Sequence, residues 1–162
     1  MRKSEPPAIA LKNPRELAAR LDLASPERLL LVDAPGSVLE LLAENRGQDR
    51  PAEIVDADAV RAVKGRFDAA FVWREDRSGS HALLDRVVSR LAPQAVLWVV
   101  TARKKVTGLR TPAARRLELA DLLAAFSKAG LRNDREVGMT AWHVAYRFVR
   151  ERSIPGREKT FR

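Results

Sequence analysis

The chain has 162 residues, no cysteine and two histidines, and its 30 lysines and arginines outnumber 21 acidic residues to give a net charge of +9. This length fits one domain, and a hydrophobic fraction of 46% is enough to build a packed core. The composition excludes disulfides, thiolate metal sites and a cysteine nucleophile, and no apolar run approaches the roughly 18 residues of a membrane span or a signal core. We therefore expect a cytoplasmic protein without a metal site.

The first predicted elements are a helix over residues 13–21 and a strand over residues 29–32. Asn13, Pro14 and Glu16 form a helix start, with a capping residue, a proline at the first position and a glutamate three residues after the cap. The apolar run at residues 29–32 is typical of a strand that is buried on both faces.

A tight turn and a second helix follow this strand. Asp33 to Gly36 provide the turn, and Ser37 with Glu40 form a second capping pair. Gly47 is the predicted end of the helix. The sequence therefore predicts a strand, a tight loop and a helix in direct succession.

The middle of the chain continues to alternate short apolar strands with amphipathic helices. The predicted strands are residues 53–55, 67–73 and 95–101, and the predicted helices are residues 58–64, 80–91 and 111–130. Alternation of this kind implies parallel strand pairing, right-handed crossovers and three layers.

The end of the chain changes to a period of two. Residues 133–139 and 142–148 are predicted strands, and Thr140 and Ala141 between them predict a hairpin. The fold class is therefore a three-layer, Rossmann-like α/β domain, with a mostly parallel sheet and a C-terminal antiparallel hairpin strand. We assign the N-terminal helical extension, the α/β domain and the flexible basic tail to residues 1–24, 25–151 and 152–162.

Four short motifs carry a resemblance to known proteins. They are residues 30–35, 67–73, 97–100 with Lys104 and Lys105 behind them, and 129–131 with 140–142. The order of elements resembles class I S-adenosylmethionine-dependent methyltransferases, and the motifs resemble a family of small bacterial proteins of unknown function with a degenerate methyltransferase fold. The resemblance covers residues 26–149. It implies a seven-stranded sheet with one reversed strand, and S-adenosylmethionine as the cofactor of the active relatives.

The loop after the first strand departs from these relatives. Their loop is of the type Asp-x-Gly-x-Gly, and alignment on Asp33 places Pro35 and Ser37 at the two glycine positions, with Gly36 between them. Proline lacks an N–H, and serine adds a side chain where the ligand approaches the backbone. We therefore expect no cofactor. The alternative is S-adenosylmethionine bound through Asp33, Gly36 and Asp56, which follows the second strand at a spacing suited to a ribose contact.

Basic residues gather in three segments, and one of them follows a strand that ends at the predicted ligand edge. Residues 102–116 hold six bases and no acid. Arg103, Lys104 and Lys105 come directly after the strand, so we expect them beside the cleft that the loop at residues 33–37 opens. Clustered bases attract phosphates.

Aromatic and charged residues accompany this predicted edge. Trp73 and Trp142 lie there, either as packing residues or as the floor of a pocket, whereas Trp98 is expected in the core. The charged run at residues 74–77 is predicted to be a surface turn, with substrate binding as its alternative.

Three functions remain open from the sequence. The main expectation is a non-catalytic, methyltransferase-like domain that binds an anionic ligand or partner. The alternatives are a divergent S-adenosylmethionine-dependent methyltransferase and a nucleic-acid-binding accessory protein. We assign no catalytic residue, expect no membrane partner and leave a homo-oligomer open. The candidate ligand-binding residues are Asp33, Pro35, Gly36, Ser37, Asp56, Trp73, Arg103, Lys104, Lys105 and Trp142.

Overall fold

A mixed six-stranded sheet in the order β2-β1-β3-β4-β6-β5 forms the centre of the computed structural model, which describes residues 10–47 and 49–150. Its strands are β1 (Leu29–Val32), β2 (Glu53–Val55), β3 (Phe67–Trp73), β4 (Leu91–Ala102), β5 (Leu131–Gly138) and β6 (His143–Arg150). β2, β1, β3 and β4 pair in parallel, and β6 runs antiparallel between β4 and β5. The predicted three-layer α/β fold with a reversed C-terminal strand is confirmed.

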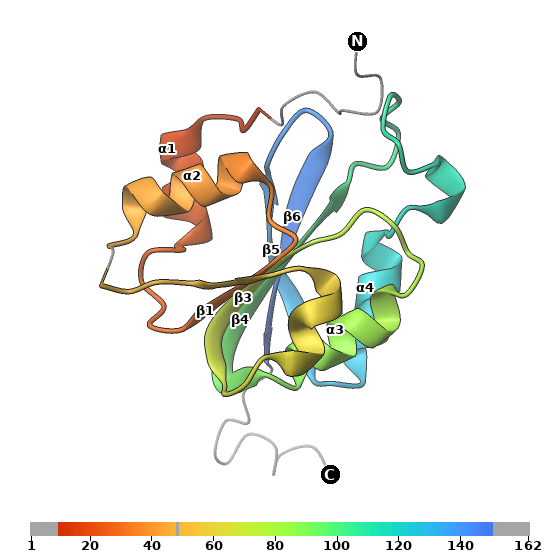
Figure 1. The fold of residues 1–162 in the computed structure, drawn as a ribbon. Coiled ribbons are helices and arrows are strands. Elements are labelled where there is room, and N and C mark those ends of the chain that lie inside the picture. The colour runs from red at the N-terminus through yellow and green to blue at the C-terminus, as the bar shows by residue number, and fades with distance from the viewer. Residues whose placement is uncertain (1–9, 48, 151–162) are drawn as a thin grey trace, which may run out of the picture.

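Helices cover both faces of this sheet (Figure 1). They are α1 (Pro14–Leu21), α2 (Gly36–Asn45), α3 (Ser80–Val88) and α4 (Leu119–Ser127), with short 3-10 helices η1 (Ala57–Ala62) and η2 (Ala113–Arg115). α1 and α2 lie on one face, whereas η1, α3 and α4 lie on the other (Figure 1). The sheet therefore has a separate apolar cluster on each side.

The strand β1 explains how a continuous apolar run serves both clusters. Leu30 and Val32 pack in the cluster under η1, α3 and α4, and Leu29 and Leu31 pack in the cluster under α1 and α2. Successive side chains of a strand point to opposite faces, so a strand between two layers has no polar face. Trp98 of β4 is 1% exposed and lies in the core, as predicted.

Two of the predicted helix starts are wrong. The residue before α2 is Pro35, in an extended conformation, and Ser37 lies inside the first turn without a capping hydrogen bond. Proline lacks an N–H and is favourable at the start of a helix, so α2 begins at Gly36, before the predicted cap Ser37. The predicted helix at residues 58–64 is the 3-10 helix η1, and Asp56 caps it by accepting the Ala59 N–H at 2.9 Å.

The predicted helix over residues 111–130 is also wrong in its first half. Apart from the single turn η2, helical structure begins only at Leu119, after a capping box between Glu118 and Asp121. The segment at residues 111–118 instead lies against the turn after β3, where the Leu117 N–H donates to the Glu75 carbonyl at 2.8 Å. These long-range hydrogen bonds replace those of a helix and bring new residues to the edge of the sheet.

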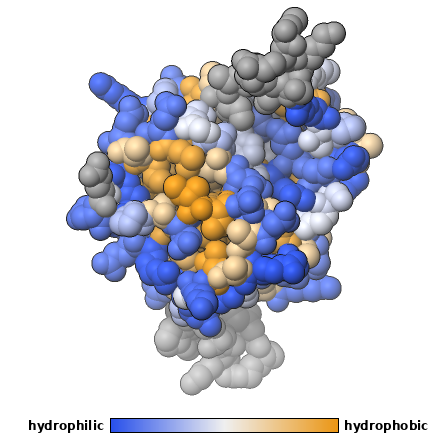
Figure 2. All heavy atoms as spheres, viewed as in Figure 1, coloured by the Kyte–Doolittle hydropathy of each residue, from blue (hydrophilic) through white to orange (hydrophobic). Residues whose placement is uncertain are grey.

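The sheet ends at β2. The described residues form six strands where the resemblance implied seven, so β2 has no further strand on its outer side within the described part of the chain. Ile54 of this strand is 55% exposed, and Figure 2 shows apolar atoms gathered on the same face, beside α2 and the sheet edge.

The predicted domain boundaries remain predictions. Leu17 and Leu21 of α1 pack in the same cluster as α2, although they belong to the predicted extension. The predicted basic tail at residues 152–162 lies outside the described residues. No helix within residues 10–47 and 49–150 has the length and apolar character that crossing a membrane requires.

Candidate functional site

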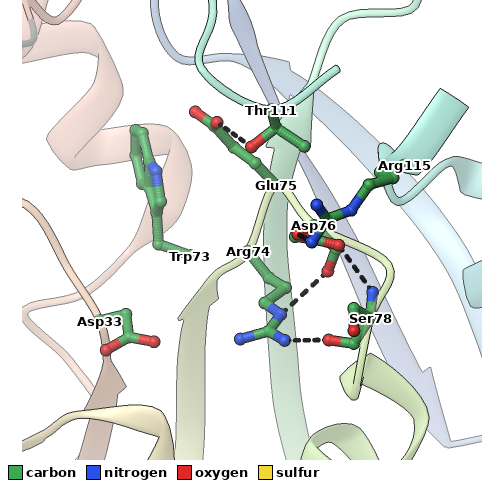
Figure 3. A pocket seen from close by; sticks show the side chains of 8 residues that line it. All are labelled: Asp33, Trp73, Arg74, Glu75, Asp76, Ser78, Thr111 and Arg115. Atoms are coloured by element: carbon green, nitrogen blue, oxygen red, sulfur yellow. Dashed lines mark hydrogen bonds and ion pairs between the residues drawn. The ribbon is translucent and has the colours of Figure 1, made fainter. Parts of the chain in front are cut away.

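A shallow cavity of about 390 Å³, largely open to solvent, lies at the carboxyl ends of β1 and β3 (Figure 3). Its lining residues are Asp33, Trp73, Arg74, Glu75, Asp76, Ser78, Thr111 and Arg115. Ligands of open α/β sheets bind at this edge, at the point where the strand order reverses, and cavities of roughly 300–1,000 Å³ hold small molecules. The position and the size therefore both suit a ligand site.

Asp33 forms the β1 side of the cavity. Its backbone has a φ of 54°, in the left-handed region, and its N–H donates to the Val55 carbonyl at 3.0 Å. The carboxylate accepts the Ala57 N–H at 3.2 Å. Burial raises the pKa of Asp33, against the lowering effect of this hydrogen bond and of Arg74. The turn thus directs a partly desolvated carboxylate to the sheet edge.

The start of α2 adjoins Asp33. Apart from Pro35, Ser37 and the nearby backbone of α2, no described atom lies within 4 Å of the position that a Cβ would take on Gly36. The Val38 N–H donates to the Pro35 carbonyl at 3.0 Å, which leaves the N–H groups of Gly36 and Ser37 without a partner inside the helix. The Ser37 Oγ is buried and has no hydrogen-bond partner among the described residues. Side chains from other described parts of the chain therefore do not fill the space at Gly36, although the loop lacks the glycine pattern.

Glu75 forms the opposite side of the cavity, and a buried histidine holds it. His143, which is 1% exposed, places its Nε2 2.5 Å from the Glu75 Oε2. The Thr111 hydroxyl donates to the other carboxylate oxygen at 3.0 Å. The hydrogen bond from His143 is the main cause of a lowered pKa for Glu75, outweighing burial. The indole of Trp73 lies 4.7 Å from the His143 ring, centroid to centroid.

The remaining charged groups of the lining are engaged with one another. Arg115 contacts the Asp76 carboxylate at 2.5 Å, and the Ser78 N–H donates to the same carboxylate at 2.8 Å. The Ser78 hydrogen bond is the first cause of a lowered pKa for Asp76. Arg74 donates to the carbonyls of Asp76 and Ser78. The lining therefore holds three carboxylates and two guanidinium groups.

The structure brings only some of the candidate residues together. Asp33 and Trp73 line the cavity, and Pro35, Gly36 and Ser37 form the adjoining helix start. Asp56 caps η1 and is not among the described lining residues.

The predicted bases lie elsewhere. Lys104 and Lys105 are exposed, and neither they, Arg103 nor Trp142 line the cavity. The Arg103 N–H donates to the Trp142 carbonyl at 2.7 Å, which extends the pairing of β4 with β6 by one residue. A ligand contact by any of these four residues stays a prediction.

Several lining and supporting residues were missed from the sequence. Glu75 belongs to the charged run that was assigned to a surface turn, and Thr111 and Arg115 belong to the segment assigned to a helix. His143 was assigned only as a strand residue. One signal was present for His143: it begins the strand after the hairpin, and a reversed strand begins at the edge where its parallel neighbour ends.

Metal binding has no support in this part of the chain. Within residues 10–47 and 49–150, no group of three histidine or acidic side chains is placed to hold a metal ion.

No protein-family model matches the sequence, and no curated protein matches it. Solved structures do resemble the fold. A methyltransferase from Aquifex aeolicus that depends on S-adenosylmethionine has a TM-score of 0.64 at 15% identity, over 84% of this chain and 88% of that one. The N-methyltransferase NodS from Bradyrhizobium japonicum WM9 has a TM-score of 0.57 at 19% identity, over 87% and 99% of the two chains.

A third similar structure is the [4+2]-cyclase SpnF, with a TM-score of 0.61 at 14% identity over 86% of this chain and 80% of that one. At identities this low, the likeness establishes the fold alone. The chain therefore has the class I methyltransferase fold that the resemblance implied.

Proposed function

We propose that this protein is a divergent S-adenosylmethionine-dependent methyltransferase, with its cofactor at the β1 side of the cavity. The observation that supports this most is the open space at Gly36 beside the Asp33 carboxylate, at the edge where this fold binds ligands. The sequence favoured a non-catalytic domain because Pro35 and Ser37 were expected to crowd the loop. No side chain from elsewhere in the described residues fills the space at Gly36, and the crowding expected from Pro35 and Ser37 themselves stays a prediction.

The residues present fit the cofactor in chemical type. The N–H groups at the start of α2 suit a polar or anionic group, and the Asp33 carboxylate suits hydroxyl or ammonium donors. Bound S-adenosylmethionine supplies an electrophilic methyl group. Glu75 and Trp73, on the other side of the same cavity, would orient the second substrate.

Calorimetry on the full chain tests this proposal. S-adenosylmethionine and S-adenosylhomocysteine should each give a saturable heat with a Kd below about 1 mM, which corresponds to roughly 4 kcal/mol of binding free energy. Gly36→Val should weaken both at least about tenfold, because a branched side chain fills the space at the loop and removes about 1.4 kcal/mol or more. Asp33→Asn should weaken both as well.

The matched control for Asp33→Asn is Asp85→Asn, since the Asp85 side chain is 64% exposed on α3 and does not line the cavity. This variant should bind both ligands as the parent does. Absence of heat at millimolar concentrations of both ligands would refute the proposal.

A second candidate is ligand binding without methyl transfer, as the sequence favoured. Pro35 offers no N–H at the loop, and the exposed Lys104 and Lys105 offer cationic groups outside the cavity. For this function, inorganic phosphate should bind, and Lys104→Ala with Lys105→Ala should abolish the binding without lowering the melting temperature. A nucleic-acid partner would instead show an affinity for oligonucleotides that falls steeply with salt.

A further inference from the structure

A chain of hydrogen bonds runs from Thr140 through His143 to the cavity. Thr140 is 2% exposed, and its Oγ1 accepts the backbone N–H groups of Trp142 and His143, both at 2.9 Å. A hydroxyl oxygen has two lone pairs and one proton. Because both lone pairs are occupied, the hydroxyl proton is left for the His143 Nδ1, 2.8 Å away. Thr140 is therefore the donor of this contact.

This donation fixes the state of the imidazole. The Nδ1 of His143 accepts a proton from Thr140 and so carries none of its own, which places the proton of the neutral ring on Nε2. The Nε2–H then points at the Glu75 Oε2, 2.5 Å away. Every hydrogen bond in the chain runs towards Glu75, which is its only member that lines the cavity.

Glu75 retains acceptor capacity that the protein does not use. An ionised carboxylate has about four acceptor positions, and the described residues supply two donors, the His143 ring and the Thr111 hydroxyl. The Glu75 side chain is 22% exposed. Its lowered pKa keeps it ionised at neutral pH. The free positions are accessible to water and to a hydrogen-bond donor of a ligand.

The neighbouring guanidinium groups do not fill these positions. Arg116 donates to the carbonyls of Thr111 and Val106 at 3.0 and 2.7 Å. Arg115 contacts Asp76, and Arg74 donates to backbone carbonyls. An anionic ligand group placed beside Glu75 would be repelled by the carboxylate, whereas an ammonium group would be attracted to it.

We infer that Glu75 binds an amino group of the molecule that occupies this cavity, and that His143 and Thr111 are positioning residues that orient its carboxylate. The ligand is then an amine in its protonated form. That this amine is the second substrate rests on the proposed methyl transfer. The amine site itself does not, because it is built from residues on the far side of the cavity from Asp33 and Gly36.

Nuclear magnetic resonance of the full chain, without cofactor, tests this inference. The probe is phenethylammonium chloride, with phenethyl alcohol and phenylacetate as neutral and anionic probes of similar shape. The indole N–H signal of Trp73, assigned with Trp73→Phe, should shift on addition of the amine. The alcohol and the acid should bind at least about tenfold more weakly, because the alcohol brings no positive charge to the Glu75 carboxylate, and phenylacetate is an anion that offers it no donor.

Glu75→Gln should weaken amine binding by about tenfold to a hundredfold, since it removes the charge and keeps the shape. Glu44→Gln, an exposed substitution on α2, is the matched control and should leave the affinity unchanged. Equal amine affinity in the Glu75→Gln variant, or tighter binding of phenylacetate than of the amine, would overturn the inference.

The positioning role has its own measurement, the pH dependence of amine binding. Thr111→Val removes a hydrogen bond that lowers the pKa of Glu75, so this pKa should rise. As the pH falls, Glu75 should then be protonated, and amine binding lost, at a higher pH than in the parent, and Thr111→Ser should restore the parent profile. An unchanged profile in Thr111→Val would show that Thr111 positions nothing. If the amine binds and S-adenosylmethionine does not, the proposed function fails and the amine site stands. The reverse result removes the amine site alone.

Discussion

Two hydrogen-bond networks of this protein each centre on a charged side chain, Arg46 in one and Glu75 in the other. They differ in whether that side chain keeps hydrogen-bonding positions that no protein group fills. Arg46, at the end of α2, is 6% exposed and donates to the carbonyls of Leu23, Ala24, Glu27 and Arg50. Glu75 receives two hydrogen bonds from the described residues and has acceptor positions to spare. The first network is closed on the backbone, and the second is open to a cavity.

The difference separates a structural charge from a functional one. The guanidinium of Arg46 ties the segment between α1 and β1 to the end of α2 through backbone carbonyls alone. Burial alone does not identify a site, because the less buried of the two charges is the one with unused capacity. Unused capacity beside a cavity is the more informative observation.

The largest expected loss of folding stability follows from a substitution in the Arg46 network. Arg46→Met should reduce the free energy of unfolding by about 3 kcal/mol, because it leaves several carbonyls without their donor. Urea denaturation measures this loss. Arg61→Met, at an exposed position of η1, should change stability by no more than about 0.5 kcal/mol. A loss below about 1 kcal/mol for Arg46→Met would mean that water satisfies these carbonyls, and the contrast between the two networks would weaken.

A smaller effect is expected at the origin of the open network. Thr140→Val should cost about 2 kcal/mol, because the N–H groups of Trp142 and His143 lose their shared acceptor. Thr140→Ser keeps the hydroxyl and should recover most of the stability. Urea denaturation of both variants, side by side, checks the order. Equal losses in the two variants would mean that the methyl group, which only Thr140→Ser removes, contributes as much as the hydroxyl.

The third effect in size is the contribution of Glu75 itself to stability against acid. Its pKa is lowered in the folded state, so its contribution is complete above the ordinary value of 4.5 and is lost as the pH falls through the folded value. Glu75→Gln should therefore cost about 1 kcal/mol at neutral pH, with partial solvent screening, and progressively less below pH 4.5. Denaturation between pH 3 and 7 measures this difference.

Asp33, which lines the same cavity, should affect the pH dependence of stability in the opposite direction. Burial raises its pKa, so its ionisation opposes folding above the folded value, and this penalty is relieved as the pH falls. Asp33→Asn should leave stability at neutral pH unchanged or slightly higher. A clear loss in this variant would show that the hydrogen bond to the Ala57 N–H outweighs burial.

The fold was readable from the sequence because its strands are apolar runs of the right length. β1 and β3 are buried almost throughout, and such runs between turn signals leave few alternatives. The segment at residues 111–118 was not readable. Thr111 and Pro112 resemble a helix start, whereas the hydrogen bonds that hold the segment against the turn after β3 come from residues about 40 positions earlier, as with Leu117 and Glu75.

Sequence reasoning reached the cavity only at strand ends. Asp33 follows β1 and Trp73 ends β3, and both line the cavity at the edge where ligands of such sheets bind, while ligand binding by either residue stays a prediction. Thr111 and Arg115 reach the cavity through the misassigned segment. His143 acts from the reversed strand, and its pairing with Glu75 spans 68 positions of the chain, so no local pattern indicates it.

The edge strand β2 is short. β2 contributes three residues, with Pro51 shortly before them and Asp56 directly after. Proline has no amide proton to offer an incoming chain, and a carboxylate is hard to bury between strands. The exposed Ile54 therefore lies on an edge strand that offers few backbone hydrogen bonds to a strand of another molecule. This limits aggregation through that edge of the sheet.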